Sequence, residues 1–516
     1  MTVTTSYPGV YVQELPSGSR TVTGVATSIT AFVGAALRGP VDEPVPIASF
    51  ADFERAFGGL WRRSGLGYAV RDFYLNGGGE ALVVRVVHTD ENAPDDSASS
   101  ATVDAGGLPL VATGPGAWAN TLVVEVTHPS GQDAEDIAQA QGVQADDLFS
   151  VVVRESDADD APSETYLNVT VADGPRRVDV VLAASGLVEV DGDLPDDRPD
   201  EDIYTVATEG ADGDAPGLAD YSGDEDDKTG MFALLRADLF NILCIPPPTP
   251  ATDVPDDLWA DAAAFCARRR AFLIVDAPAT ATAANIDDWA AGDGALTGVN
   301  MRNAALYFPR IRRPDPLRGG AAADFAACGA VAGTFARADA ARGVWKAPAG
   351  TEAGLAGVSG LTVPLTDAEN GRLNPLGINC LRTFRGVGPV VWGARTLRGS
   401  DILSDEYKYV PVRRLALFLE ESLFRGTQWV VFEPNDEPLW AQIRVSLGAF
   451  MQDLFRRGAF QGATPRDAYF VRCDADTTTA YDIDRGIVNI LVGFAPLKPA
   501  EFVIISIQQK TAAAGA

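Results

Sequence analysis

The sequence predicts a multidomain α+β protein with a βαβ-containing core, an inserted β-rich domain, a C-terminal α+β domain and extended terminal strands. Three observations predict this fold class. The chain has 516 residues, which is too long for one hydrophobic core and favours two to four domains. Short apolar runs of strand length alternate with amphipathic helical patterns along most of the chain. Residues 131–228 contain 28 acidic and 5 basic residues, so −23 of the net charge of −30 is confined to one segment.

The N-terminal segment is expected to be extended and to need a partner. Residues 7–16 and 21–25 have the composition of strands, with a turn at Pro8-Gly9 and a polar stretch between the two runs. Neither run has a neighbouring strand with which it could form a hairpin, and an isolated strand is not stable in water. We therefore assign residues 1–24 to an N-terminal linking arm that adds to a sheet elsewhere. Pairing within its own chain is the alternative.

The α/β core is expected to be discontinuous in sequence, comprising residues 25–88 and 231–372. Apolar runs of the kind found in buried strands occur in both parts, at 29–34, 81–87, 240–245, 271–276 and 303–308. Helical patterns lie between them, at 50–57 and 259–269. The second of these helices stands between two strands and gives a βαβ unit. The densest basic cluster, Arg310–Arg313, follows the last of the strands.

Residues 89–230 are expected to form a β-rich outer insertion with an acidic face. Loops rich in Asp, Ala and Gly alternate there with apolar runs of strand length, at 121–127, 149–154, 166–171 and 178–182. Phosphate binding needs clustered basic residues, so this composition argues against nucleic acid and anionic lipid as partners. The Asp-rich runs lack the spacing and the final Glu of a calcium-binding loop. We therefore expect a solvated acidic surface and no metal site there.

The C-terminal α+β domain is assigned to residues 373–500. Two amphipathic helices are expected within it, at about 412–424 and about 436–455, and the second has acidic residues and Pro in its first turn. A final arm strand and tail are assigned to residues 501–516. Left unpaired, this strand would expose a row of backbone donors and acceptors. Both ends of the chain are therefore expected to be strands that need a sheet.

Neither a membrane nor an oxidising compartment is indicated by the sequence. No apolar run reaches the ~18–20 residues that a membrane-spanning helix needs, and the first residues lack the basic head and apolar stretch of a signal peptide. The 5 cysteines are scattered and include no Cys-x-x-Cys pair. This pattern is typical of free, mostly buried thiols in a protein made in a reducing compartment. We expect no direct membrane insertion.

An enzyme is the alternative that the βαβ unit raises, because an α/β sheet places its catalytic groups at the carboxyl ends of its strands. Asp276 ends one strand, but the chain has only 2 histidines, His88 and His128, and both lie upstream. No Gly-x-Ser-x-Gly, His-Glu-x-x-His or Gly-x-Gly-x-x-Gly motif accompanies them. We therefore expect no enzyme activity and no catalytic, metal or cofactor site, and a βαβ hydrolase is the less favoured interpretation.

Several runs of sequence in the second half of the chain carry a resemblance to one family. They are Gly343–Pro348, Leu373–Cys380, Val391–Leu397, Tyr409–Leu415, Trp429–Asp436 and Pro496–Phe502. In this order they resemble the contractile tail sheath proteins of phages and of phage-tail-like contractile injection systems. The resemblance covers residues 1–88 and 231–510 and leaves the insertion unmatched. One departure lies at Ala326–Gly329, where many members have a Pro-Pro-Ser-Gly turn.

The resemblance implies a structural subunit that polymerises as stacked hexameric rings around an inner tube. Contraction of this sheath would drive the tube through a target envelope. The implied partners are further copies of the chain, the inner tube protein, and baseplate and terminator or cap proteins. The implied location is a phage tail or injection particle that is assembled in the cytoplasm. A different self-assembling lattice protein is the alternative.

Two sets of residues are expected to act in this assembly. In the family, the terminal arms complete sheets of neighbouring subunits. The corresponding strand residues here are Tyr7, Val10, Tyr11, Val12, Val22, Val25, Phe502, Val503, Ile504, Ile505 and Ile507. Pairs of arginines near the ends of the two C-terminal helices are expected at the tube or subunit interface, with local ion pairing as the alternative. They are Arg413, Arg414, Arg456 and Arg457.

Overall fold

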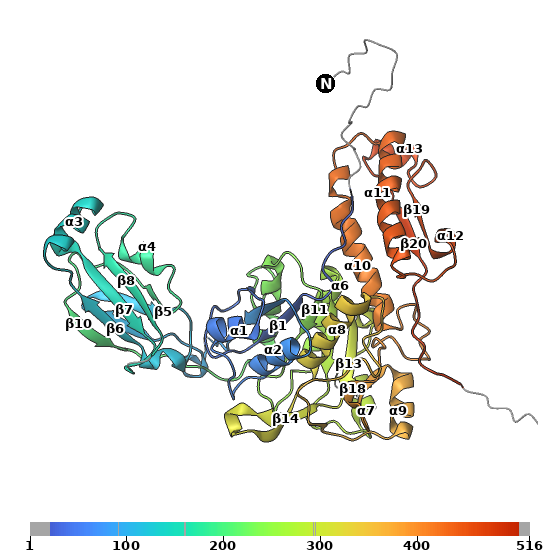
Figure 1. The fold of residues 1–516 in the computed structure, drawn as a ribbon, viewed down its shortest axis with the longest axis horizontal. Coiled ribbons are helices and arrows are strands. Elements are labelled where there is room, and N and C mark those ends of the chain that lie inside the picture. Colours follow the sequence, from blue (N-terminus) through green and yellow to red (C-terminus); the bar gives the residue numbers. More distant parts are fainter. Residues whose placement is uncertain (1–20, 91, 159–160, 293, 295, 505–516) are drawn as a thin grey trace, which may run out of the picture. The chain divides into compact units, whose positions relative to one another are not determined.

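The computed structural model describes residues 21–504, apart from positions 91, 159, 160, 293 and 295. The chain is a mixed α/β protein with several sheets (Figure 1) and divides into two compact units. The larger unit comprises residues 27–342 and 347–410. Within the described residues, the smaller unit comprises residues 21–26, 343–346 and 411–504.

A sheet of mostly parallel strands forms the centre of the larger unit. Its eight strands in the described chain have the spatial order β18, β17, β13, β12, β11, β1, β3 and β2. Six neighbours run parallel: β3 (Ala81–Arg85), β1 (Thr30–Gly34), β11 (Ile242–Cys244), β12 (Phe272–Asp276), β13 (Ala304–Phe308) and β17 (Ile378–Phe384). The antiparallel strands β2 (Val45–Ile47) and β18 (Gly388–Val391) close the two edges. The chain starts at β1, moves outward to β3 and returns to β11 on the other side of β1, as in doubly wound folds.

Helices cover both faces of this sheet, which explains why its strands are apolar throughout. On one face, Phe73 of α2 (Leu66–Leu75) contacts Phe32 of β1, and Phe335 of α8 (Cys328–Arg342) contacts Phe272 of β12. On the other face, α6 (Leu258–Arg269) packs against the remaining strand residues in one buried cluster. The expected helix over residues 50–57 is confirmed as α1 (Phe50–Phe57), and the expected βαβ unit is confirmed as β11, α6 and β12.

The smaller unit begins later in the sequence than predicted. Residues 373–410 were assigned to the C-terminal domain, but they belong to the larger unit. There β17 extends the parallel sheet beside β13, and β18 pairs with β17. The physical reason is that the run Ile378–Leu381 is buried at every position, as in a strand inside a covered parallel sheet.

Most of the acidic segment folds around a hydrophobic core of its own. One antiparallel sheet contains β4 (Thr102–Ala105), β5 (Leu108–Ala112) and β9 (Val188–Val190). A second contains β10 (Asp202–Thr205), β6 (Val123–Thr127), β7 (Phe149–Arg154) and β8 (Ser163–Val169). The inward residues of both sheets form one buried cluster. The strands expected at 121–127, 149–154 and 166–171 correspond to β6, β7 and β8.

The strand expected at residues 178–182 is wrong, because this run forms the helix α4 (Val178–Leu182). In a strand, Val178, Val180 and Leu182 would share one face. In the structure Val178 and Leu182 are fully buried, whereas Val180 is 53% exposed. Burial at positions i and i+4 with exposure between them is the pattern of a helix. The β-branched composition favoured a strand, but the packing of the surrounding core decided the conformation.

Two long helices and a two-stranded sheet form the smaller unit. They are α10 (Val410–Gly426), α11 (Glu437–Arg456), β19 (Tyr469–Arg472) and β20 (Leu491–Phe494), with the short helices α12 (Pro465–Ala468) and α13 (Ala480–Asp484) beside the strands. Asp436 caps α11 by accepting a hydrogen bond from the backbone N–H of Leu439 at 3.2 Å, and Pro438 lies in the first turn. Both predicted C-terminal helices are confirmed.

The end of the N-terminal segment packs against its own chain. Residues 21–26 form no strand, so the strand predicted over residues 21–25 is wrong. Val22 is 5% exposed in the buried cluster that contains Leu415 and Leu419 of α10. The backbone N–H of Val25 donates to Ser422 Oγ at 3.2 Å. A helix surface of the same chain therefore buries Val22, and Val25 is partly buried beside it.

The described helices include none that is both long and apolar enough to span a bilayer. All of the cysteines are buried free thiols, as the sequence predicted.

Candidate functional site

The carboxyl edge of the central sheet is where an α/β fold would place a catalytic group. Asp276, the last residue of β12, is buried at this edge. Its Oδ1 atom accepts hydrogen bonds from the backbone N–H groups of Ala327 (2.7 Å) and Cys328 (2.9 Å). Burial raises the pKa of Asp276 above its ordinary value. The carboxyl group thus holds the first residues of α8 in place at the sheet edge.

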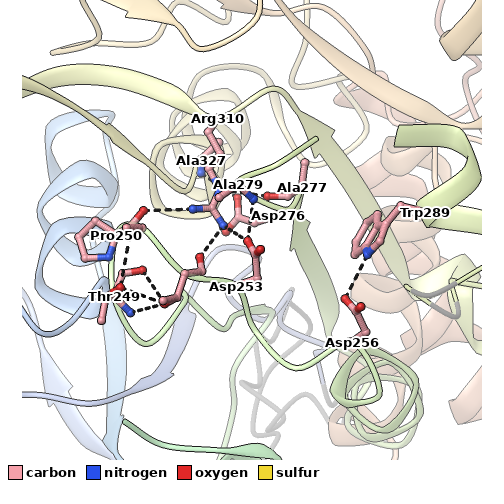
Figure 2. A network of polar contacts seen from close by, with 12 residues as sticks. Thr249, Pro250, Asp253, Asp256, Asp276, Ala277, Ala279, Trp289, Arg310 and Ala327 are labelled. Carbon is pink, nitrogen blue, oxygen red and sulfur yellow. Dashed lines mark hydrogen bonds and ion pairs between the residues drawn. The ribbon is translucent and has the colours of Figure 1, made fainter. Parts of the chain in front are cut away.

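Arg310 fills the space beside Asp276 (Figure 2). Its side chain is 5% exposed and is surrounded by acceptors from the loops that follow β11 and β12. The guanidinium group donates to the carbonyl oxygens of Ala277 (3.1 Å), Pro250 (3.1 Å) and Thr252 (2.9 Å) and to Asp253 Oδ1 (2.6 Å). The same Asp253 oxygen accepts the backbone N–H of Ala279 at 2.7 Å. One arginine therefore joins the loops that would otherwise border a ligand crevice.

The two histidines do not complete a catalytic arrangement with Asp276. His88 Nδ1 lies 2.9 Å from Asp220 Oδ2, and His128 Nε2 lies 2.8 Å from the carbonyl oxygen of Pro199. Neither ring is a partner of Asp276. Across the described ranges, no cluster of three or more His, Cys, Asp or Glu side chains could hold a metal ion. The geometry of this edge fits a structural role.

The His88–Asp220 pair makes stability depend on pH. The hydrogen bond to Asp220 raises the pKa of His88 above its ordinary value. Such a pair stabilises the fold fully below the unfolded-state pKa of ~6.5, and the stabilisation is lost as pH rises through the folded-state value. We expect His88→Gln to lower the melting temperature more at about pH 6 than at about pH 9. His128→Gln is the control, because it removes a bond to the carbonyl of Pro199 and only a distant contact with a carboxylate, 3.9 Å from Nδ1 to Glu201 Oε2. An equal loss at both pH values for His88→Gln would contradict the prediction.

The two-stranded sheet of the smaller unit has outer edges with which no described segment pairs. The backbone N–H of Ala495 donates to the carbonyl of Ala468 at 2.8 Å. In an antiparallel ladder the residues that exchange such bonds alternate with residues whose backbone groups point outward. The register pairs Tyr469 with Phe494 and Val471 with Val492. Alternation therefore directs the N–H and C=O groups of Val471 and the C=O group of Tyr469 to one outer edge, and the backbone groups of Val492 and Phe494 to the other. The N–H of Tyr469 donates to the carbonyl oxygen of Pro465 at the end of α12.

The two faces of this sheet differ in burial. Tyr469, Val471, Val492 and Phe494 pack against the cluster formed by α10 and α11. On the opposite face the ring of Phe470 covers Gly493, where an added Cβ would lie 2.2 Å from that ring. A short sheet with one packed face and two open edges can accept another strand at either edge. The sequence offered aromatic and β-branched runs here, but the long connection between them hid their pairing.

The predicted arm residues fall into three groups. Tyr7, Val10, Tyr11, Val12, Ile505 and Ile507 lie outside the described residues. Phe502, Val503 and Ile504 belong to no strand and are 74%, 81% and 89% exposed. Val22 and Val25 contact their own smaller unit, where Val22 packs against α10 and the N–H of Val25 donates to Ser422. This is the pairing within the same chain that the sequence left as the alternative, and a linking role for these two residues stays a prediction.

The four predicted interface arginines differ in how far their side chains are buried. Arg413 and Arg414 are buried at 7% and 3% exposure, and Arg413 donates to Glu420 Oε1 at 3.0 Å. The bond from Arg413 to Glu420 is the local pairing that the sequence left as the alternative, and an interface role for Arg413 and Arg414 stays a prediction. Arg456 and Arg457 are exposed, and the guanidinium of Arg457 lies 5.4 Å from the ring centre of Trp345.

Comparison with known proteins gives matches over most of the chain. The family model described as "Phage tail sheath protein central domain" matches residues 222–397, and the model described as "Phage tail sheath C-terminal domain" matches residues 404–510. The tail sheath protein of Burkholderia phage BcepMu is 24% identical over 479 residues, which cover 88% of this chain and 87% of that protein. The tail sheath protein of Vibrio phage KVP40 is 26% identical over 179 residues, 34% of this chain and 25% of that protein.

Solved structures share the fold. The sheath complex of the extracellular contractile injection system PVC, in its contracted state, has a TM-score of 0.59 and 22% identity, with 99% of each chain covered. The contracted helical sheath of the anti-feeding prophage has a TM-score of 0.57 and 22% identity, covering 98% of this chain and 100% of that one.

Proposed function

Because this chain belongs to the phage tail sheath family and is a structural subunit of a contractile sheath, we propose that its copies link to one another by strand exchange between terminal arms and the β19–β20 sheet. The copies would form stacked hexameric rings around an inner tube, assembled in the cytoplasm and attached to a baseplate, with a terminator or cap protein at the far end. Contraction of this lattice would drive the tube through a target envelope.

The observation that carries the proposal is the pair of open edges on the β19–β20 sheet. One edge presents the N–H and C=O groups of Val471 and the C=O group of Tyr469, and the other edge presents the backbone groups of Val492 and Phe494. The arm sequences over residues 7–16 and 501–509 have strand composition and are long enough to cover a strand of four residues. One arm at each edge would convert the two-stranded sheet into a four-stranded one, which is stable where a two-stranded sheet is marginal.

Strand exchange suits a lattice that changes shape. Main-chain hydrogen bonds hold the arm in its acceptor sheet whichever way the donor subunit is turned. The two compact units can then move as rigid bodies while the linked arms keep the copies connected. We infer that contraction rearranges the contacts between rigid units and leaves the exchanged strands paired.

The tube-facing surface is proposed to include the connection between α10 and α11. Val431 and Phe432 are 63% and 103% exposed, and Phe432 has a φ of 70°. A bulky residue held in the left-handed region and fully exposed marks a site of interaction rather than packing. The exposed Arg456 and Arg457 remain candidates for contact with the tube or a neighbouring subunit.

The role is proposed to be structural only, without catalysis. The buried side chains of Asp276 and Arg310, at the carboxyl edge of the sheet, form hydrogen bonds with backbone groups of neighbouring loops. Those contacts support a scaffold function for the central sheet.

The test of strand exchange is a proline at an outward-pointing donor. We expect Val492→Pro to abolish long sheaths, because proline removes the N–H that an added strand would use. Val492→Ala trims the side chain but keeps that N–H, so it is the matched control and should assemble. Negative-stain electron microscopy at rising protein concentration reports assembly, and circular dichroism confirms folding. Hollow striated tubes formed by Val492→Pro, at the concentration where the wild type assembles, would contradict the strand-exchange proposal.

A further inference from the structure

A groove in the larger unit has an excess of positive charge that the residues described by the structure do not neutralise. Its cavity volume is about 760 Å³, and it lies beside the hairpin of β14 (Ile311–Asp315) and β15 (Ala321–Phe325). The charged residues that line it are Arg62, Arg310, Arg312, Arg318, Asp315 and Asp324. Four arginines thus face two carboxylates in a chain whose net charge is −30.

Two of these four arginines already pair with carboxylates of the same chain. Arg310 is held by Asp253 and the carbonyl groups described above. Arg312 makes a two-bond pair with Asp324, at 2.6 Å and 3.0 Å. In the part of the chain that the structure describes, Arg62 and Arg318 have no ion-pair or hydrogen-bond partner, and both are exposed. The groove therefore offers two available guanidinium groups, whose planar donors suit carboxylates.

The segment that runs from the end of β9 to the first residue of β10 has the opposite character. Residues 191–202 contain seven acidic side chains and one arginine, and every one of the acids is exposed. Among the described residues, the carboxylates of Asp191, Asp193, Asp196 and Asp197 have no ion-pair or hydrogen-bond partner. We call residues 191–202 the acidic loop.

We propose that the arginine groove binds the acidic loop of a second copy of this chain. The inference rests on the proposed function, because a lattice of identical copies brings the loop of one subunit to its neighbours at high effective concentration. It also gives the acidic insertion a role. Repeated segments of charge −23 repel one another in a lattice, and pairing part of that charge with available arginines offsets the repulsion.

The occupant is a peptide segment rather than a small anion. A groove of about 760 Å³ holds far more than one phosphate or carboxylate ion, given that a water molecule takes ~30 Å³ of liquid. The acidic loop supplies seven carboxylates within 12 residues, so more than one of them can enter the groove that Arg62 and Arg318 line.

Binding is tested first without assembly. A fluorescent peptide with the sequence of residues 189–203 is titrated against the unassembled full chain, and its anisotropy is followed. We expect binding that weakens at least ~10-fold in Arg62→Glu/Arg318→Glu and that weakens as salt rises, because exposed charges are screened. Arg385→Glu/Arg466→Glu makes the same charge change at exposed arginines outside the groove and should leave binding intact. No binding, or equal loss in both double variants, overturns the proposal.

The source of the loop is tested in assembled sheaths. In a chain carrying Arg318→Cys and Asp196→Cys, mild oxidation should join neighbouring copies into a ladder of covalent oligomers. Arg318→Cys with Asp133→Cys, an exposed acid on α3 (Gln132–Gln141), should give none. A crosslink within one chain, or none in well-formed sheaths, overturns the proposal. If no sheaths form while the peptide still binds the groove, the proposed function fails and the groove assignment stands.

Discussion

A chain that lacks residues 2–20 is expected to fold normally and to form no long sheaths. The deletion removes the strand-like run at 7–16, which is proposed to pair with an open edge of the β19–β20 sheet in a neighbouring copy. It keeps Val22, Gly24 and Val25, which pack against α10 of the same chain. The lattice would lose one of its two proposed strand-exchange links between subunits, while both compact units keep their hydrophobic cores.

The position of the cut decides what the experiment measures. A deletion that extends to residue 24 would also remove Val22, which is 5% exposed in the core of the smaller unit. Burying a valine contributes about 1.5–3 kcal/mol, so the longer deletion would destabilise that unit and confuse a folding defect with an assembly defect. The shorter deletion separates the two.

Electron microscopy and calorimetry together check this prediction. The truncated chain should show wild-type thermal transitions and only monomers or short oligomers at concentrations where the wild type forms striated tubes. A deletion of residues 505–516 is the companion variant, and it should shorten sheaths in the same way if both arms act. Normal tubes from the chain without residues 2–20 would mean that the N-terminal arm has no linking role.

The strands and helices of the core were predictable because their hydrophobic patterns are local. The runs at 29–34, 81–87, 271–276 and 303–308 are apolar at almost every position, which only a sheet covered on both faces satisfies. The helix α11 was predictable because Asp436 precedes it as a capping residue, Pro438 lies in its first turn and apolar residues recur at helical spacing. In both cases the local preference agrees with the tertiary environment.

The errors arose where tertiary packing decides between alternatives that look alike in sequence. Residues 178–182 have a composition that suits a strand, and only the core around them makes them a helix. The run Ile378–Leu381 is a good strand in either domain, and its pairing with β13 was not visible from the sequence. Val22 lies in a run with strand composition, but a helix surface of its own chain covers its side chain.

The candidate sites show the same limit at the level of single residues. The cluster Arg310–Arg313 was visible in the sequence as a run of basic residues, but its arginines differ in exposure in the fold. Arg310 and Arg313 are buried at 5% and 2% exposure, whereas the side chain of Arg312 is 47% exposed. The β19–β20 acceptor was missed because long-range pairing joins two short runs that no turn connects. Charge and composition identified the arginine cluster and the strand-like runs, but only the fold determined which residues they contact.

Replacing Arg310 with methionine is expected to destabilise the larger unit by ~3–5 kcal/mol, since removing one partner of a buried charged network leaves the others unsatisfied. Methionine retains much of the apolar stem but no donor, so the carbonyl groups of Ala277, Pro250 and Thr252 would lose their shared partner. The carboxylate of Asp253 would keep only the N–H of Ala279 as an ordered donor. The loops after β11 and β12 would then be held to β13 by packing alone.

The matched control replaces Arg312, two residues further along the chain, with methionine. Arg312→Met removes a two-bond ion pair with Asp324, but the side chains of both partners are more than 40% exposed. An exposed pair is worth ~0–1 kcal/mol, so this variant should melt close to the wild type. Differential scanning calorimetry of the full chains compares the two, and hydrogen exchange at β12 and β13 locates the loss. Equal melting temperatures for Arg310→Met and Arg312→Met would mean that water replaces the guanidinium and that the network does not hold the edge of the sheet together.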